Sequence, residues 1–268
     1  MIDVLSACAV FALLWGSGAA GLLLQPHLRA AHRTRETFEV VQVIIVMLVT
    51  FAALVLGLLT ASAKQTYDQA DRDRGDYAME LSRLDRCLRS YGPEADGARR
   101  DLASYTAAVI ASTWPDEPPP TGVDYPDTSH MARTGPSQKL EALLEDAGLS
   151  IDRLDASDTY HARLAQRCVG DWRGLFNGRM AVIEDTRAAI SAPFYWILVF
   201  WLMIIFASIG LSAPQNRFVA ILLGIAALSL SSVMWVIFDL GQPYGGFFSI
   251  PSTGMREALA EMLAPPLP

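Results

Sequence analysis

The sequence has few charged residues and lacks the common catalytic and metal-binding motifs. Charged residues make up 18% of its 268 residues, against about 25% in typical soluble domains. It contains no Gly-Lys-Ser/Thr phosphate loop, no Cys-x-x-Cys pair and no two histidines four residues apart. Nucleotide-binding loops, dithiol redox sites and zinc sites of the His-Glu-x-x-His kind need those patterns. We therefore expect no enzymatic activity, no cofactor and no bound metal.

Basic residues are too sparse to form a nucleic-acid-binding surface. The 21 Lys and Arg residues are outnumbered by 28 Asp and Glu, which gives a net charge of −7. Nucleic-acid binding relies on a clustered basic surface, so we expect no nucleic-acid partner. In the stretch DRDRGDYAMELSRLDRCLR, acids and arginines alternate. This pattern predicts a salt-bridged, solvent-exposed helix face rather than paired acid and base catalysts.

Apolar residues are abundant and concentrate in four blocks. They form 52% of the chain, and the blocks cover roughly residues 2–24, 40–63, 194–211 and 218–240. Each is long enough to cross a hydrocarbon core of about 30 Å as a helix. No basic residue precedes the first block, which is also too long for a signal peptide, so we expect it to be retained. The sequence thus predicts an all-α integral membrane protein with four transmembrane helices, whose main partner is the lipid bilayer.

The rest of the sequence predicts a helical extramembrane domain inserted between the second and third transmembrane helices. We assign residues 1–63 to helices one and two with a basic loop, 64–191 to the inserted domain, and 192–241 to helices three and four. Residues 242–268 would form a re-entrant turn and a short amphipathic helix. Within the inserted domain, apolar periodicity predicts a helix over 65–90 and another ending at Trp114. Residues 115–136 are rich in Pro and Gly and predict a loop.

Two further helices are expected after that loop. Ser137 is a plausible N-cap for QKLEALLEDAG, and Gly148 is placed near the C-terminus of that helix. A long helix over roughly 155–190 would then return the chain to the membrane.

Arginines in the short loops predict the orientation of the chain. Arg29, Arg33 and Arg35 follow the first apolar block, and Arg217 lies between the third and fourth. Short loops that carry Lys and Arg stay in the cytoplasm. We therefore expect the middle domain and both termini to be periplasmic in a bacterial inner membrane.

Two cysteines of the middle domain are candidates for a disulfide. Cys87 and Cys168 each lie some two dozen residues from a membrane end, which on antiparallel helices places both about 35 Å above the bilayer. A disulfide between them would fit an oxidising compartment. The alternative is two unrelated buried thiols.

Three glycines follow one face of the returning helix. Gly170, Gly174 and Gly178 stand four residues apart in GDWRGLFNG, and each costs the helix about 1 kcal/mol relative to Ala. Such a stripe predicts a close helix contact. The contact could lie within the chain, against the helix that bears Cys87, or against another subunit.

Charged residues at the ends of two transmembrane helices are candidates for an ion pathway. Lys64 ends the second apolar block and Asp239 ends the fourth. Lys64 could attract an anion at the entrance of a passive pore, or it could extend its ammonium group to the membrane interface. The helix dipole disfavours an anion at the position of Asp239. Asp239 therefore needs a basic partner, either Lys64 or a residue at the base of the outer domain.

Several segments resemble the bestrophin-like domain family. They are LVLGLLTASAKQTYD, LDRCLRSYGPEADGARRDLASY followed by a Trp-Pro pair, SAPFYW at the third transmembrane helix, and DLGQPYGG at the end of the fourth. The resemblance covers nearly the whole chain. It implies kinship with bestrophins, which are anion-selective channels assembled as rings of subunits. The expected function is thus an oligomeric passive channel for small anions, and the expected partner is a homo-oligomer.

The closing motif of the family has the form Asp-x-x-x-Pro-aromatic-Gly. In this sequence the resemblance assigns it to Asp239, Pro243, Tyr244 and Gly245. Pro243, Gly245 and Gly246 would turn the chain sharply. The motif could be a structural clasp, or it could line an ion or ligand entrance that includes Tyr244. The alternative function is a non-conducting membrane protein whose outer helical domain binds a partner or senses the cell envelope.

Overall fold

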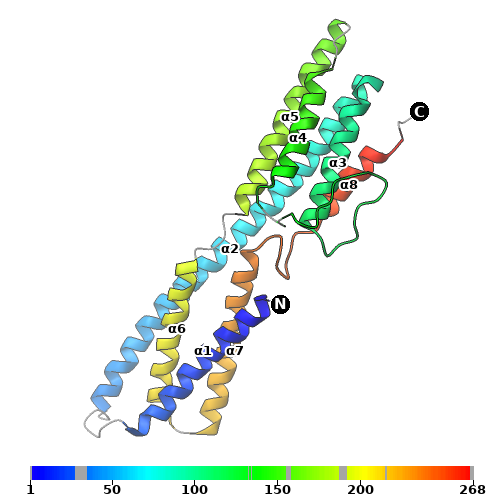
Figure 1. The fold of residues 1–268 in the computed structure, drawn as a ribbon. Helices are drawn as coiled ribbons and strands as arrows, with labels where there is room; N and C mark the ends of the chain where they lie inside the picture. Colours follow the sequence, from blue (N-terminus) through cyan, green and yellow to red (C-terminus); the bar gives the residue numbers. More distant parts are fainter. Residues whose placement is uncertain are drawn as a thin grey trace. The chain divides into compact units, whose positions relative to one another are not determined.

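The computed structural model is built of helices joined by loops (Figure 1). It describes residues 2–27, 35–131, 133, 135–154, 158–186, 192–214 and 216–265. No strand occurs among these residues, so the prediction of an all-α protein is confirmed. The chain forms two compact units. Unit 1 comprises Met1–Thr66 and Ala189–Gly241, and unit 2 comprises Tyr67–Ala188 and Gln242–Pro268.

Unit 1 is formed by long apolar helices. Its elements are α1 (Ile2–Leu24) with the short η1 (Gln25–His27), the first part of α2 (Arg35–Tyr91), α6 (Ala192–Ser212) and α7 (Arg217–Leu240). Helix α1 packs against both α6 and α7 (Figure 1). Leu14, Leu198 and Ala227 lie at the centre of the shared core and are almost fully buried. Arg29 and Arg33, which carry the orientation prediction, lie outside the described residues.

Helices α1 and α6 approach so closely that only glycine fits at the contact. A Cβ atom added to Gly21 would overlap the carbonyl oxygen of Ala207. A Cβ atom added to Gly210 would overlap the carbonyl oxygen of Gly18. Small residues permit this backbone approach in lipid, where helices gain from tight packing rather than from escape from water. Gly21 of the first apolar block therefore serves helix packing.

All four helices of unit 1 are long and apolar enough to cross a membrane. The four helices differ in the fraction of the apolar segment that is buried by other parts of the chain. Only 6% of that segment of α2 is buried, against 22% for α1, 39% for α6 and 28% for α7. The surface of α2 in this part of the chain is therefore left for lipid or for other subunits.

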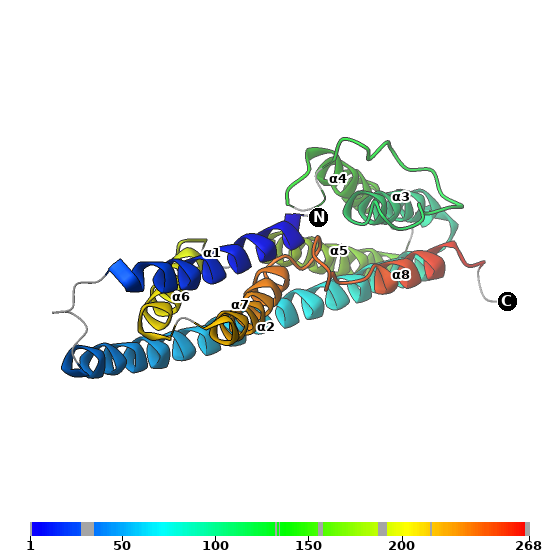
Figure 2. The same ribbon diagram turned by 90° about the horizontal axis from the view of Figure 1, so that it is seen from below.

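Unit 2 is a helical domain with its own core. It contains the remainder of α2, η3 (Pro93–Ala95), α3 (Asp96–Thr113), α4 (Gln138–Asp152), α5 (Thr159–Asp185) and α8 (Thr253–Leu263). Helix α3 packs against α4 and α8, and α4 packs against α5. The chain between α3 and α4 forms a long loop beside α3 (Figure 2). The expected end of α3 at Trp114 and the loop after it agree with the structure.

A disulfide links α2 and α5 inside the core of unit 2. It joins Cys87 to Cys168, whose Cα atoms are 5.6 Å apart. The bridge closes a sequence separation of 81 residues. By reducing the entropy of the unfolded chain, such a cross-link stabilises the folded state by about 4.5 kcal/mol at 25 °C.

The expectations for α4 are confirmed only in part. Ser137 is the N-cap residue, because the helix begins at the next residue, but its side chain makes no capping hydrogen bond. Gly148 does not end the helix, which continues to Asp152. An added Cβ at Gly148 would lie 2.6 Å from the Trp172 ring of α5. Close packing of α4 on α5, rather than a helix end, explains the glycine.

The alternating charges of α2 do not form a uniformly solvated face, which corrects the prediction made from their pattern. Arg83 is exposed and pairs with Glu80 at 2.9 Å, as expected. Arg74 and Asp85, however, are only 6% and 2% exposed. They face the interior because α3 and the C-terminal segment cover that side of the helix.

The close approach of α1 and α6 predicts that alanine is harmful at two glycines. We expect Gly21→Ala and Gly210→Ala each to destabilise the protein by about 1–3 kcal/mol, because the new methyl group displaces a backbone. Gly16→Ala in α1 is the matched control, since nothing lies within 4 Å of a Cβ there. Thermal unfolding of the purified protein in detergent measures the difference. Equal unfolding temperatures for all three variants would contradict the contact.

Candidate functional site

Lys64 and Asp239, the charged residues predicted at the membrane ends, both belong to unit 1. Lys64 is exposed on α2, whereas Asp239 lies in the last turn of α7 and is only 1% exposed. The carboxylate is therefore buried at the end of the helix where the dipole disfavours a negative charge. Which basic residue neutralises it stays a prediction.

Residues 242–246 form the turn that follows α7. The backbone N–H groups of Gly245 and Gly246 donate to the carbonyl oxygen of Gln242, at 3.2 and 3.3 Å. Ile250 N–H donates to the Pro243 carbonyl at 2.8 Å. Neither glycine has a positive φ. The turn therefore does not depend on the left-handed backbone conformation that glycine allows.

Tyr244, the aromatic residue of that turn, lies in an aromatic cage around a buried arginine of unit 2. The Arg74 guanidinium carbon is 4.7 Å from the centre of the Tyr244 ring and 4.8 Å from that of Trp114. The two rings meet edge to face, with centroids 6.4 Å apart. Trp114 is held by its indole N–H, which donates to the Ile250 carbonyl at 2.8 Å. The cage thus ties the residues after α7 to α2 and to the end of α3.

A second buried arginine lies in the same part of unit 2. Arg179 of α5 is 6% exposed, and its Nη1 donates to the Tyr105 hydroxyl at 2.8 Å. The Tyr105 hydroxyl in turn is hydrogen-bonded to the Tyr77 hydroxyl of α2. Burial disfavours the guanidinium charge, but the two tyrosines outweigh it and raise the pKa of Arg179. Arg179 is therefore a fixed positive charge.

Arg74, Arg179 and Tyr244 line one cavity. It has a volume of about 40 Å³, and Tyr77, Thr113 and Leu140 also contribute to its wall. Arg133 stands at the same cavity with a side chain that is 49% exposed. A cavity needs only about 10–15 Å³ by this measure to hold one water. The site can therefore accept a few water-sized groups next to positive charge.

A pair of carboxyl groups flanks Arg74. Partial burial raises the pKa of Asp185 to about 6, and the neighbouring Asp73 carboxylate adds to this rise. Arg74 acts in the opposite direction. Two carboxyl groups in contact share a proton more readily than either holds one alone.

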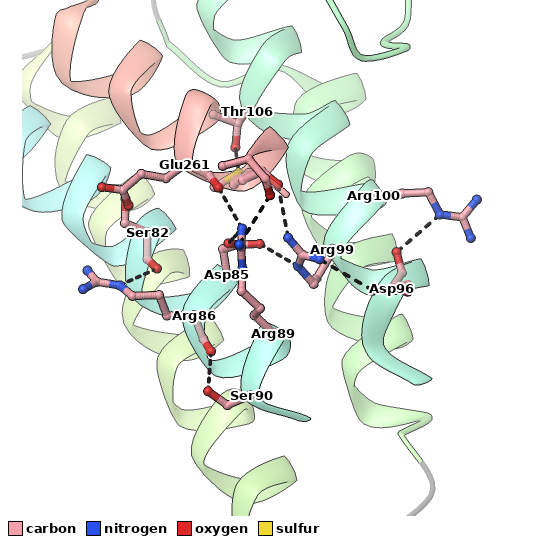
Figure 3. A network of polar contacts seen from close by, with 12 residues as sticks. Ser82, Asp85, Arg86, Arg89, Ser90, Asp96, Arg99, Arg100, Thr106 and Glu261 are labelled. Carbon is pink, nitrogen blue, oxygen red and sulfur yellow. Dashed lines mark hydrogen bonds and ion pairs between the residues drawn. The ribbon is translucent and has the colours of Figure 1, made fainter. Parts of the chain in front are cut away.

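The C-terminal end of α8 is held by a network around a buried carboxylate (Figure 3). Asp85 accepts from Arg99 Nε at 2.9 Å and from Arg89 Nη2 at 3.2 Å. Arg89 also donates to the Glu261 carbonyl at 2.7 Å, and Arg99 donates to the Met262 carbonyl at 3.1 Å. The last carbonyls of a helix lack partners within it and favour positive charge. Asp85 thus positions two arginines that satisfy the end of α8.

The N-terminal end of α8 is held by a carboxylate from the loop after α3. Glu117 accepts hydrogen bonds from the Ser252 hydroxyl and from Arg256 Nε, the latter at 3.0 Å. Arg256 also donates to the Pro118 carbonyl at 2.7 Å. Partial burial alone would raise the pKa of Glu117, but the hydrogen bonds and the Arg256 charge lower it below its usual range. An ion pair therefore fixes the N-terminal end of α8 to the rest of unit 2, and hydrogen bonds from two arginines fix its C-terminal end.

The glycine stripe of α5 meets α2 at two of its three positions. A Cβ at Gly178 would lie 3.3 Å from the Tyr77 ring, and one at Gly174 would lie 3.1 Å from the Glu80 carboxylate. Nothing lies within 4 Å of a Cβ at Gly170.

The two buried arginines were missed in the sequence, although a signal was present. Arg74 falls on the apolar stripe of α2, four residues after Ala70 and three before Tyr77. Arg179 lies on the buried stripe of α5 in the same way, four residues after Leu175 and three before Val182. A charged residue on an apolar stripe indicates a buried charge, and such charges need partners.

The raised pKa of Asp185 predicts a pH-dependent effect of its removal. The folded state binds this proton more tightly than the unfolded chain, whose carboxyl has an ordinary pKa of 3.8. Asp185 therefore lowers the free energy of unfolding increasingly as the pH rises from 3.8 through about 6. The full destabilisation is present above about pH 6. We expect Asp185→Asn to raise the unfolding temperature at pH 7.5 and to change it little near pH 4. Asp76→Asn, at an exposed acid of α2, is the control. A gain for Asp185→Asn that is the same at both pH values would contradict the shift.

Comparison with known proteins identifies the family. The sequence model of the bestrophin-like domain matches residues 12–255. A search of curated proteins gives no match. Two solved structures of variants of a bacterial bestrophin homolog from Klebsiella pneumoniae are similar to the chain, with TM-scores of 0.58 and 0.59. Their identities are 16% and 17%; the matches cover 97% and 96% of this chain, and 100% and 98% of theirs.

A further solved structure, described as a membrane protein, is 14% identical and has a TM-score of 0.60. That match covers 96% of this chain and 97% of the other. At these identities the structures show a shared fold, and the sequence match shows the family. The chain is a membrane protein of the bestrophin-like domain family.

Proposed function

We propose that this chain is one subunit of an oligomeric membrane channel that passes small anions passively. Two findings support this function: the match to the bestrophin-like domain and the fold shared with bacterial bestrophin homologs. Bestrophins, which the family resembles, are anion-selective channels assembled as rings. Within this chain, the proposal is supported mainly by the distribution of exposed side chains on α2.

The apolar part of α2 has three distinct faces when its residues are placed at about 100° each. One face packs in the core of unit 1 through Ala52 and its neighbours Leu48, Val55, Leu56 and Leu59. A second face is exposed and bulky. It carries Ile44, Met47, Phe51, Leu54 and Leu58, which are between 51% and 63% exposed.

The third face of α2 is exposed and, apart from Val46, carries small or polar side chains and Lys64. Its residues lie within a sector of about 80°. They are Gln42, Val46, Thr50, Ala53, Gly57 and Lys64. Bulky apolar side chains suit lipid, whereas small and polar ones suit a water-filled pore or a close neighbour. We assign the bulky face to lipid and the small polar face to the pore, with Lys64 attracting anions at one end.

The proposal includes four transmembrane helices, with unit 2 outside the membrane. Four helices meet the length and apolarity that a crossing requires. The disulfide between Cys87 and Cys168 supports a periplasmic position for unit 2, because disulfides persist in oxidising compartments. In this arrangement the protein lies in the inner membrane, with both termini in the periplasm. Asp239 and the turn at Pro243 would stand at the periplasmic rim.

Anion flux into liposomes tests the channel function. We expect the purified protein to conduct halide, and Lys64→Glu to lower that flux severalfold, because the reversed charge repels anions from the entrance. Lys139→Glu is the matched control, since it makes the same charge change at an exposed residue of α4 in unit 2. Its flux should equal that of the wild type.

Two outcomes of this measurement would contradict the proposal. An oligomer that is folded but passes no halide would favour a non-conducting protein whose outer domain binds a partner or senses the envelope. Equal loss of flux in both lysine variants would remove Lys64 from the pathway.

Thiol labelling in intact cells tests the orientation. Cys8 is the free cysteine among the described residues, so a Cys8→Ser background leaves the disulfide pair alone. We expect Cys87 and Cys168 to resist a thiol reagent until a reductant is added, and a membrane-impermeant reagent to reach them once the outer membrane is opened. Labelling that requires disruption of the inner membrane would place unit 2 in the cytoplasm.

A further inference from the structure

The cavity of unit 2 that Arg74, Arg179 and Arg133 line is unusual in its charge. Three arginines contribute to its wall, and no acidic residue is among the described residues that line it. Two of these arginines are 6% exposed, so water cannot fully solvate them. A buried charge is expensive unless a partner compensates it.

The known partners of the two buried arginines leave hydrogen-bond donors unused. Within the described part of the chain, the Nε atoms of Arg74 and Arg179 are both buried and without a hydrogen-bond partner. The guanidinium carbon of Arg74 lies close to the rings of both Trp114 and Tyr244. These cation–π contacts provide no hydrogen-bond acceptor for the Nε–H group. Both arginines can therefore donate to a further group in the cavity.

Two acidic residues, Asp73 and Asp185, lie close enough to Arg74 to interact with its charge, but neither contributes to the wall of the cavity. The tyrosines that hold Arg179 are neutral donors and acceptors rather than anions. Arg133, the third arginine, has a carboxylate partner in Asp116 at 2.9 Å, but that acid is 81% exposed and screened by water.

We propose that this cavity of unit 2 binds a small monovalent inorganic anion of the size of chloride, bromide or nitrate. The available 40 Å³ suits such an ion and is far below the several hundred Å³ that bound organic molecules usually occupy. The ion accepts from Arg74 and Arg179, and Arg133 stands at the exposed side as the route of entry. The site lies wholly within unit 2 and does not depend on ion conduction by unit 1.

Bromide binding to the full-length protein in detergent tests this site. We expect sodium bromide to raise the unfolding temperature with saturation, because a ligand that binds only the folded state stabilises it. Sodium gluconate at equal ionic strength is the control, since gluconate is too large for the cavity. Arg133→Ala should weaken bromide binding about threefold to tenfold, as the loss of a partly screened charge would. Arg83→Ala removes an exposed arginine of the same unit and should leave the affinity unchanged.

A direct structural measurement keeps the test independent of any variant. Anomalous diffraction from crystals of the wild-type protein in bromide should show a peak between Arg74 and Arg179. A bromide peak elsewhere with none in this cavity would overturn the proposal. So would equal stabilisation by gluconate, or an Arg133→Ala variant with wild-type affinity. Failure of halide flux in liposomes would leave these binding results unaffected, so the two proposals can fail separately.

Discussion

Unit 1 exposes a large apolar surface, which limits how its helices can be arranged. Val43, Phe51 and Leu54 of α2 are more than half exposed within the chain, and only a bilayer or other subunits can cover them. In hydrocarbon each backbone polar group needs an internal partner, which continuous helices provide. Because lipid supplies no hydrophobic drive between helices, α1 and α6 associate through backbone contact at Gly21 and Gly210.

Unit 2 is stabilised differently, because ion pairs and a disulfide contribute to its packing. Its core holds the disulfide between α2 and α5, and arginines fix both ends of α8. Asp85 is buried between Arg89 and Arg99, so that each arginine reaches a helix carbonyl with its charge compensated. Removing one charged residue from such a group leaves the remaining charges buried and unpaired. The resulting loss of stability is larger than the net stabilisation that the complete group provides. In the cavity of Arg74 and Arg179 the compensation is incomplete, and there we place a bound anion.

The sequence predicts well those features that depend on local composition or on the number of residues between two positions. The length of the apolar blocks predicts the helices of unit 1. The similar distances of Cys87 and Cys168 from the membrane ends predict that the two thiols meet.

Burial of a charged side chain depends instead on which residues cover it. The place of Arg74 on the apolar stripe of α2 indicates that it is buried, but the rings that enclose it, those of Trp114 and Tyr244, lie 40 and 170 residues away in the sequence and no local pattern identifies them. For the same reason Gly148 looks like a helix end, when it makes room for Trp172. The basic partner of Asp239 and the face of α2 that we propose lines a pore are not determined by sequence patterns, because both depend on side-chain positions or on neighbouring subunits.

We propose that α2 divides its exposed surface between lipid and a pore shared by several subunits. An experimental structure of the full-length protein in a lipid nanodisc would show which residues of α2 face lipid and which face the pore. We expect a symmetric ring in which Thr50 and Gly57 face the central axis, while Met47 and Leu54 face the lipid. A monomer, or a ring whose axis is lined by another helix, would contradict the account.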